Sequence, residues 1–516
     1  MAHPRASPWI SADESDPPES TDPPPRPDPH PSHRYLPVDP TAAGLPARSA
    51  SPHPADSVPL AATDDGSATN ALATDAAARR GRLLQVLGVG FGLAVTVGNT
   101  IGAGILRAPG EVAGHLPTVA LYLAAWILGA GYALLGANSL AELGTMMPRS
   151  GAMYVFARRA LGPYAGFVVG WNDWIATAGS CAAVSVVIGE YLGDLVPAVA
   201  GHPAWIALAA IAAFTALQWR GVRTAGRAQQ LTSLLKAVLL LALVAACLSW
   251  TGTRAEPHAA APAAGISLMA AFILSMQSVI YTYDGWNGVL YFSGEVRNPG
   301  RDIPRSMFGG VLSVGAIYLL VNLAFLHVLP LAAMAGAKLA AGAAMGAVLG
   351  PWGDTAIRVL VILALLSSVS ALSMMAPRVL YAMGADGLVS ARTTAVNAGG
   401  TPTVALLASS AVAAVFAATG AFDFIIAVLS FFFVANYVLC FVSVFVLRRR
   451  APDAPRPYRA WGYPFTTALA LVCSLAFLAG AVASDTTNSL YALAALALSW
   501  PAYLLSRRWM RAAAAA

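Results

Sequence analysis

Twelve apolar runs of about 20 residues each lie between residues 87 and 506, and each is long enough to cross a bilayer as a helix. Because backbone groups in lipid must hydrogen-bond within the protein, membrane-spanning chains form helices or closed barrels, and runs of this length are helical. The sequence therefore predicts an all-α membrane protein with about 12 transmembrane helices. The predicted spans are 87–112, 117–141, 164–191, 203–219, 229–250, 266–293, 307–329, 355–383, 402–419, 423–447, 463–484 and 487–506.

Composition and charge support this class and orient the spans. Hydrophobic residues make up 57% of the chain and charged residues 11%, against about 25% charged residues in soluble domains. Arginines gather before span 1 and after every even-numbered span, whereas the opposite loops hold only Arg254 and Lys338. The positive-inside rule then predicts a multi-pass protein of the cell (plasma or inner) membrane with both termini cytoplasmic. These arginines also explain the net charge of +6 without a nucleic-acid partner.

The chain divides by composition into a tail and a membrane domain. Residues 1–78 contain sixteen of the 35 prolines and eleven acidic residues. High proline content and low hydrophobicity predict a disordered tail. We expect a transporter domain over residues 79–511 and a short tail over 512–516.

Reactive side chains do not form a catalytic pattern. The four cysteines fall inside predicted spans, and His327 is the only histidine near a span interior. No metal-ligand cluster and no Ser–His or Cys–His arrangement can be assembled from these positions. We therefore expect no enzyme, no cofactor and no bound metal.

Two of the predicted spans carry interruptions. Gly98–Ile105 places glycines in the middle of span 1, and Tyr283–Gly288 does the same in span 6. Glycine in a helix interior costs roughly 1 kcal/mol relative to alanine. Paired interruptions in corresponding segments of two halves are the best sequence indication of a transporter's binding site.

Several motifs resemble the amino acid–polyamine–organocation superfamily of permeases, and most of all its L-type amino acid transporter branch. The similarity rests on Gly98–Ile105, Ala141–Gly144, Pro148–Tyr154, Gly285–Pro304, Arg378–Met383 and Asp386-Gly387. It implies two inverted repeats of five helices, spans 1–5 and 6–10, with spans 11 and 12 appended. It also implies secondary active transport of amino acids, with a polyamine or cationic amino acid transporter or antiporter as the alternative.

The two breaks suit a zwitterionic substrate. The outer half of span 1 begins near Gly104, where free N–H groups at a helix N-terminus attract a carboxylate. The outer half of span 6 ends near Tyr281–Tyr283, where free carbonyls suit an ammonium group. The predicted substrate-binding residues are Thr100, Ile101, Gly102, Ala103, Gly104, Ile105, Tyr281, Tyr283, Asp284, Gly285 and Trp286. For the three aromatic residues, ordinary packing is the alternative.

Lys236 lies about seven residues into span 5, roughly 10 Å deep at 1.5 Å per residue. It could extend its ammonium back to the membrane surface. The family resemblance implies another role, in which this ammonium replaces the sodium ion of sodium-coupled relatives. It would then bridge the span-1 break to the span-8 hydroxyls Ser367, Ser368 or Ser370. Transport would be sodium-independent, by exchange or by proton coupling.

Two charges depart from the family pattern, Arg107 beyond the first break and Asp284 at the second. Charges inside a membrane are costly and indicate function. We expect either an ion pair between them or a substrate ammonium held by Asp284. The loop 192–203 lacks the cysteine with which animal relatives bind a heavy subunit, so no disulfide-linked partner is expected.

Overall fold

The computed structural model describes residues 83–252, 267–337, 339–419, 422–484 and 486–515. The predicted tail over 1–78 and the residues Arg254 and Lys338 lie outside these ranges. The α-helices are α2 Val89–Thr100, α3 Gly104–His115, α4 Val119–Met146, α5 Met153–Leu161, α6 Pro163–Leu195, α7 Pro203–Trp219, α8 Val222–Leu248, α9 Leu268–Tyr283, α10 Pro299–Val328, α11 Leu331–Met334, α12 Ala340–Leu349, α13 Trp352–Ala385, α14 Thr403–Thr419, α15 Phe422–Arg450, α16 Phe465–Ser484 and α17 Thr486–Ala515. The 3-10 helices are η1 Pro197–Val199, η2 Gly288–Glu295 and η3 Ala391–Thr394.

The described residues form an all-α membrane protein, as predicted. Within these described ranges, eight helices are long and apolar enough to cross a membrane, and the bent pair α2–α3, taken as one span, makes a ninth. The apolar helices α7 and α14 are shorter. Each of the twelve predicted runs coincides with one helix or with a broken pair. The sequence prediction did not include α5, α11 and α12, and α17 continues to Ala515 through most of the segment predicted as a short tail.

Both predicted interruptions are real breaks in the helices. Helix α2 ends at Thr100 and α3 starts at Gly104, with an angle of 47° between them. Helix α9 ends at Tyr283, and after a short turn the chain continues as η2. The second half of span 6 is therefore a 3-10 helix. Such helices have poorer hydrogen-bond geometry than α-helices and are usually shorter.

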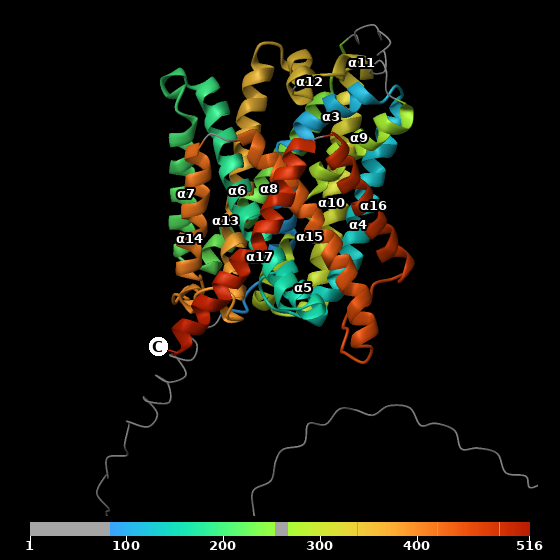
Figure 1. Cartoon of the computed structure of the whole chain (residues 1–516). Coiled ribbons are helices and arrows are strands. Elements are labelled where there is room, and N and C mark those ends of the chain that lie inside the picture. Colours follow the sequence, from blue (N-terminus) through green and yellow to red (C-terminus); the bar gives the residue numbers. More distant parts are fainter. Residues whose placement is uncertain (1–82, 253–266, 338, 420–421, 485, 516) are drawn as a thin grey trace, which may run out of the picture. The chain divides into compact units, whose positions relative to one another are not determined.

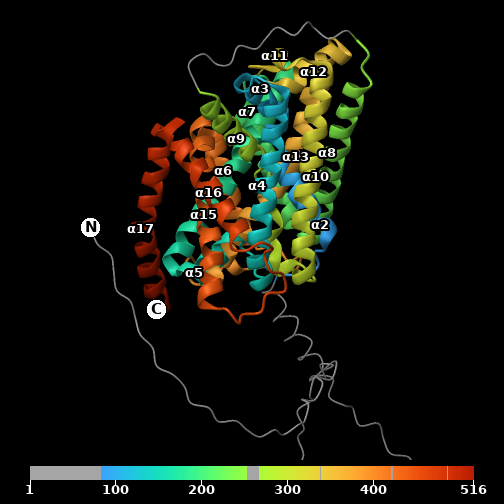
Figure 2. The same ribbon diagram turned by 90° about the vertical axis from the view of Figure 1, so that its right-hand side faces the viewer.

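The broken spans lie inside the bundle, surrounded by the long helices. Helix α2 packs against α8, α10 and α13, while α3 packs against α9. Helix α6 packs against α13 over much of its length. Figure 1 shows α3, α11 and α12 at one end of the bundle and α5 at the other. In Figure 2, α17 lies at the edge of the bundle opposite α8.

Ion pairs gather at the end of the bundle where α5 lies, and they join the family-like motifs. Glu142 of α4 accepts hydrogen bonds from Arg448 at 2.6 and 2.7 Å and from Arg456 at 3.1 Å. At the end of η2, the fully buried Glu295 receives two bonds from Arg378 of α13, at 3.0 and 3.1 Å. Two-pronged pairs of this kind fix geometry as well as charge. The Glu142 contacts tie span 2 to the end of span 10, and the Glu295 pair ties span 6 to span 8.

Asp386 forms a third cluster at the same end. Its carboxylate accepts hydrogen bonds from Arg149 and Tyr154, each at 2.9 Å, and pairs with Arg158 at 2.9 Å. The motifs 148–154 and Asp386-Gly387, which are far apart in the sequence, are thus brought together.

Candidate functional site

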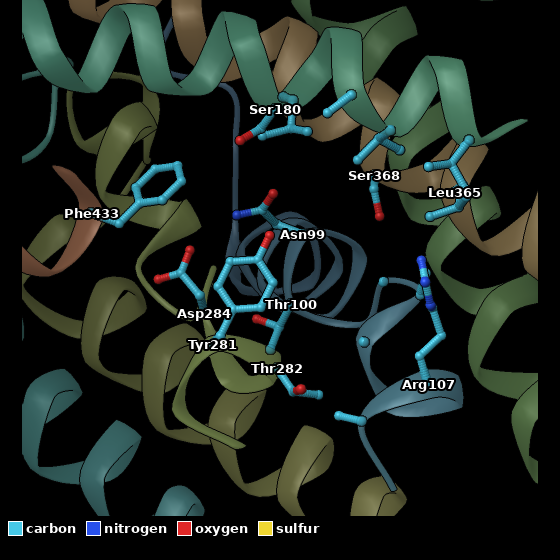
Figure 3. Close-up of a pocket in the computed structure, with 18 of the residues that line it drawn as sticks. Asn99, Thr100, Arg107, Ser180, Tyr281, Thr282, Asp284, Leu365, Ser368 and Phe433 are labelled. Carbon is cyan, nitrogen blue, oxygen red and sulfur yellow. The ribbon is translucent and has the colours of Figure 1, made fainter. Parts of the chain in front are cut away.

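A cavity of about 530 Å³ lies between the two helix breaks (Figure 3). Its size falls within the roughly 300–1,000 Å³ of small-molecule sites. Helices α6, α13, α15 and α16 also line it, through residues such as Ser180, Leu365, Phe433 and Phe477. Eight residues predicted from the sequence line it: Thr100, Gly102, Ala103, Gly104, Arg107, Tyr281, Asp284 and Ser368.

The start of α3 faces this cavity with unused donors. The first N–H groups of a helix have no acceptor within the helix, and no side chain caps α3 at Ala103. Gly102, Ala103 and Gly104 all line the cavity. A carboxylate at this point would meet both the free N–H groups and the positive end of the helix dipole.

The two breaks approach each other closely, and Gly285 makes this possible. Its φ is +104°, and a Cβ atom there would lie 2.6 Å from Nδ2 of Asn99 and 3.0 Å from the backbone N of Thr100. Only glycine adopts this conformation at low cost and leaves room for the backbone of the first break. The Asn99 amide also donates a hydrogen bond to the Gly285 carbonyl at 3.4 Å.

Tyr318 of α10 also connects the two breaks. Its buried hydroxyl lies 2.9 Å from the carbonyl oxygen of Thr100 and 3.0 Å from that of Thr282. Sequence reasoning did not identify this residue, because a tyrosine within an apolar span carries no local sign that it reaches a helix break.

The Lys236 side chain lies within the bundle, at the first break. Its ammonium donates hydrogen bonds to the carbonyl of Gly98 at 2.8 Å, to that of Ile101, and to the Ser368 hydroxyl at 3.1 Å. The residue is 1% exposed. A lysine extending to the membrane surface would instead leave its ammonium in water.

The three candidate serines of α13 differ in their contacts. Ser368 donates to the Gly98 carbonyl at 3.1 Å and accepts from Lys236. The Ser367 hydroxyl lies 3.2 Å from the Ser233 hydroxyl of α8 rather than beside the Lys236 ammonium. The Ser370 hydroxyl is buried without a hydrogen-bond partner. Only Ser368 therefore contacts the ammonium.

Several carbonyls at the two breaks are already engaged by side chains of the protein. Gly98 accepts from Lys236 and Ser368, and the carbonyls of Thr100 and Thr282 share the single hydroxyl proton of Tyr318. Asp284 is therefore the stronger candidate for an ammonium group, since its carboxylate lines the cavity.

Five of the predicted binding residues do not line this cavity. Tyr283 is buried and donates its hydroxyl proton to the carbonyl of Trp126 at 3.2 Å. Trp286 is buried and stacks on Tyr437, with ring centroids 5.1 Å apart. The remaining three, Ile101, Ile105 and Gly285, are buried beside the breaks. Tyr281, in contrast, is 44% exposed in the cavity wall.

Arg107 and Asp284 share the cavity but do not form an ion pair in this conformation. No salt bridge within 4.0 Å connects them, and Figure 3 shows them on opposite sides of the pocket. The Asp284 carboxylate instead accepts a hydrogen bond from Tyr437 of α15 at 2.5 Å. The expected direct contact is absent because their side chains face each other across the cavity.

The family is settled by sequence comparison. A model of the amino acid permease family matches residues 87–500 of the chain. The chain belongs to this family. The residues that match the family model thus coincide closely with those of the twelve predicted spans of this permease.

Individual relatives agree with the family. Over 414 residues this permease is 28% identical to the serine/threonine exchanger SteT of Bacillus subtilis, covering 79% of this chain and 93% of that protein. It is 25% identical over 404 residues to the branched-chain amino acid permease BcaP of the same organism, covering 73% and 84%. It is 29% identical over 255 residues to the mouse b(0,+)-type amino acid transporter 1, covering 48% and 52%. Amino acid transport is therefore its function, and the polyamine alternative is not favoured.

Proposed function

We propose that this permease carries zwitterionic amino acids without sodium, by exchange or proton coupling. The substrate carboxylate lies at the N-terminus of α3, beside Gly102–Gly104. The substrate ammonium lies across the cavity, beside the Asp284 carboxylate and near the end of α9. Opposite charges of the substrate thereby meet opposite charges of the site, which favours a zwitterion over an ion of either sign.

The observation that carries this proposal is the position of the Lys236 ammonium. It is buried and bonded to Gly98, Ile101 and Ser368. These three oxygens are hard ligands of the kind that a small cation uses. With the Lys236 ammonium among them, a sodium ion would meet both repulsion and occupied ligands, so none is needed to hold the break together.

Uptake into proteoliposomes with sodium replaced by choline at fixed pH tests this. Labelled L-serine, L-leucine and L-alanine serve as probes. We expect equal initial rates in the two buffers for whichever probe is carried. A large loss of rate in choline would contradict the assignment of Lys236.

We further propose that the protein acts in the cell membrane with both termini cytoplasmic, as a transporter without enzymatic activity. The arginine clusters around Glu142, Glu295 and Asp386 would then lie on the cytoplasmic side, below the cavity. Cysteines placed in the loops of the protein and labelled from outside on intact cells test this orientation. Labelling of a cysteine in the loop between α4 and α5 would contradict it.

A further inference from the structure

A carboxyl group lies inside the bundle next to the cavity and plays no part in the site described so far. Asp173, in the first half of α6, is 0% exposed. Its Oδ1 atom accepts a hydrogen bond from the Tyr291 hydroxyl of η2 at 2.6 Å. Its Oδ2 atom is buried with no hydrogen-bond partner. One half of this carboxyl group is thus satisfied and the other is open.

Among the described residues, no cation neutralises Asp173. No lysine, arginine or histidine lies within 4.0 Å of it. The titratable groups that act on it are Tyr291 of η2, Asp284 after α9 and Cys440 of α15. Five arginines on the helices packed against α6 are engaged elsewhere: Arg158 with Asp386, Arg378 with Glu295, Arg358 with Asp194 and Asp354, Arg448 with Glu142, and Arg507 over the Tyr503 ring.

An ionised carboxylate in this position is unfavourable, because it is removed from water with no cation and one unsatisfied oxygen. A proton on Oδ2 removes the charge and leaves Oδ1 free to accept from Tyr291. The environment therefore suits a carboxyl group that binds and releases a proton.

The cavity provides the route for that proton. Tyr291, which contacts Asp173, is part of the cavity wall, and so is Asp284. Asp284 acts electrostatically on Asp173. A negative charge on Asp284 would disfavour a second negative charge on Asp173.

We propose that Asp173 is the site of the proton that this permease moves together with its amino acid. This inference rests on the proposed function, in which the substrate ammonium lies beside Asp284. An ammonium there favours the ionised form of Asp284, so Asp173 is the carboxyl of the two that holds the proton. One O–H bond forms at Oδ2 when a proton enters from the cavity, and the same bond breaks when it leaves on the other side. The loaded carrier holds one proton with one amino acid.

The experiment measures proton movement and amino acid movement separately in proteoliposomes of the full chain. A pH-sensitive dye trapped inside reports acidification when L-serine, L-leucine or L-alanine is added outside. Counterflow of the same labelled amino acid reports its transport in the absence of a proton gradient. We expect the wild type to acidify the interior, and Asp173→Asn to keep counterflow while its acidification falls about tenfold or more.

Asp194→Asn is the matched control, because Asp194 lies at the far end of the same helix in an exposed ion pair with Arg358. It should acidify as the wild type does. Counterflow by a wild type that moves no protons would overturn the proton site but leave amino acid transport standing. Full acidification by Asp173→Asn would also overturn it. Loss of counterflow by the wild type itself would instead refute the proposed function.

Tyr291→Phe gives a second test if Asp173→Asn does not fold. The Tyr291 hydroxyl stabilises the ionised form of Asp173, so its removal makes the carboxyl hold its proton more tightly. The pH at which uptake is half-maximal should rise by about one unit. An unchanged pH dependence would contradict the proposal.

Discussion

Replacement of Gly285 by alanine should disable the permease by separating the two helix breaks. Alanine at φ +104° costs about 1–2 kcal/mol for the backbone conformation alone. Its Cβ atom would lie 3.0 Å from the backbone C of Asn99 and N of Thr100. Backbone atoms cannot rotate away as side chains do, and relief of such overlaps typically costs about 1–3 kcal/mol more. The sum is roughly 2–5 kcal/mol, paid by moving one break away from the other.

Two measurements check this expectation. Thermal unfolding in detergent should show a clear fall in the midpoint temperature, and counterflow should fall by about tenfold or more. Gly288→Ala is the matched control three residues later, since its Cβ atom would meet only Val95 at an ordinary contact distance of 3.4 Å. Normal transport by Gly285→Ala would refute the view that close contact between the breaks is needed.

Three further substitutions test other contacts. Lys236→Ala should abolish transport while the protein still reaches the membrane. The control variant Leu235→Ala, at the exposed neighbouring residue, should transport normally. Equal uptake rates for the two variants would contradict the role of the ammonium. Glu295→Gln should destabilise the fold by about 3–5 kcal/mol in thermal unfolding, because the buried Arg378 loses its counter-ion; an unchanged midpoint would show that the pair is dispensable. Tyr318→Phe should keep the fold, at a cost of about 1 kcal/mol, and slow counterflow, and an unaltered rate would exclude a role in joining the breaks.

The fold and the breaks could be predicted from sequence because their causes are local. Apolar runs of membrane-spanning length and glycines inside them, such as Gly98 and Gly285, are visible in the sequence itself. The direction of a side chain around its helix is not. Tyr283 follows Thr282 in the same helix end, yet Thr282 lines the cavity and Tyr283 packs against Trp126.

Contacts between distant spans were the other part that sequence could not supply. Arg107 and Asp284 both reach the cavity, as predicted, but which group each one meets depends on how α3, α9 and α15 pack. Asp173 could have been found, because the same intramembrane charge rule that selected Asp284 applies to an aspartate in span 3.

The tethered position of Lys236 has an electrical consequence. A dissolved cation that accompanies a substrate leaves with it, and membrane voltage then contributes about 2.3 kcal/mol per elementary charge for every 100 mV. The Lys236 ammonium is part of the chain and returns with the empty carrier, so over a full cycle it transfers no net charge. A zwitterionic amino acid adds none either. Any current that accompanies transport must therefore come from another transported ion, and in this permease the proton on Asp173 is the one proposed.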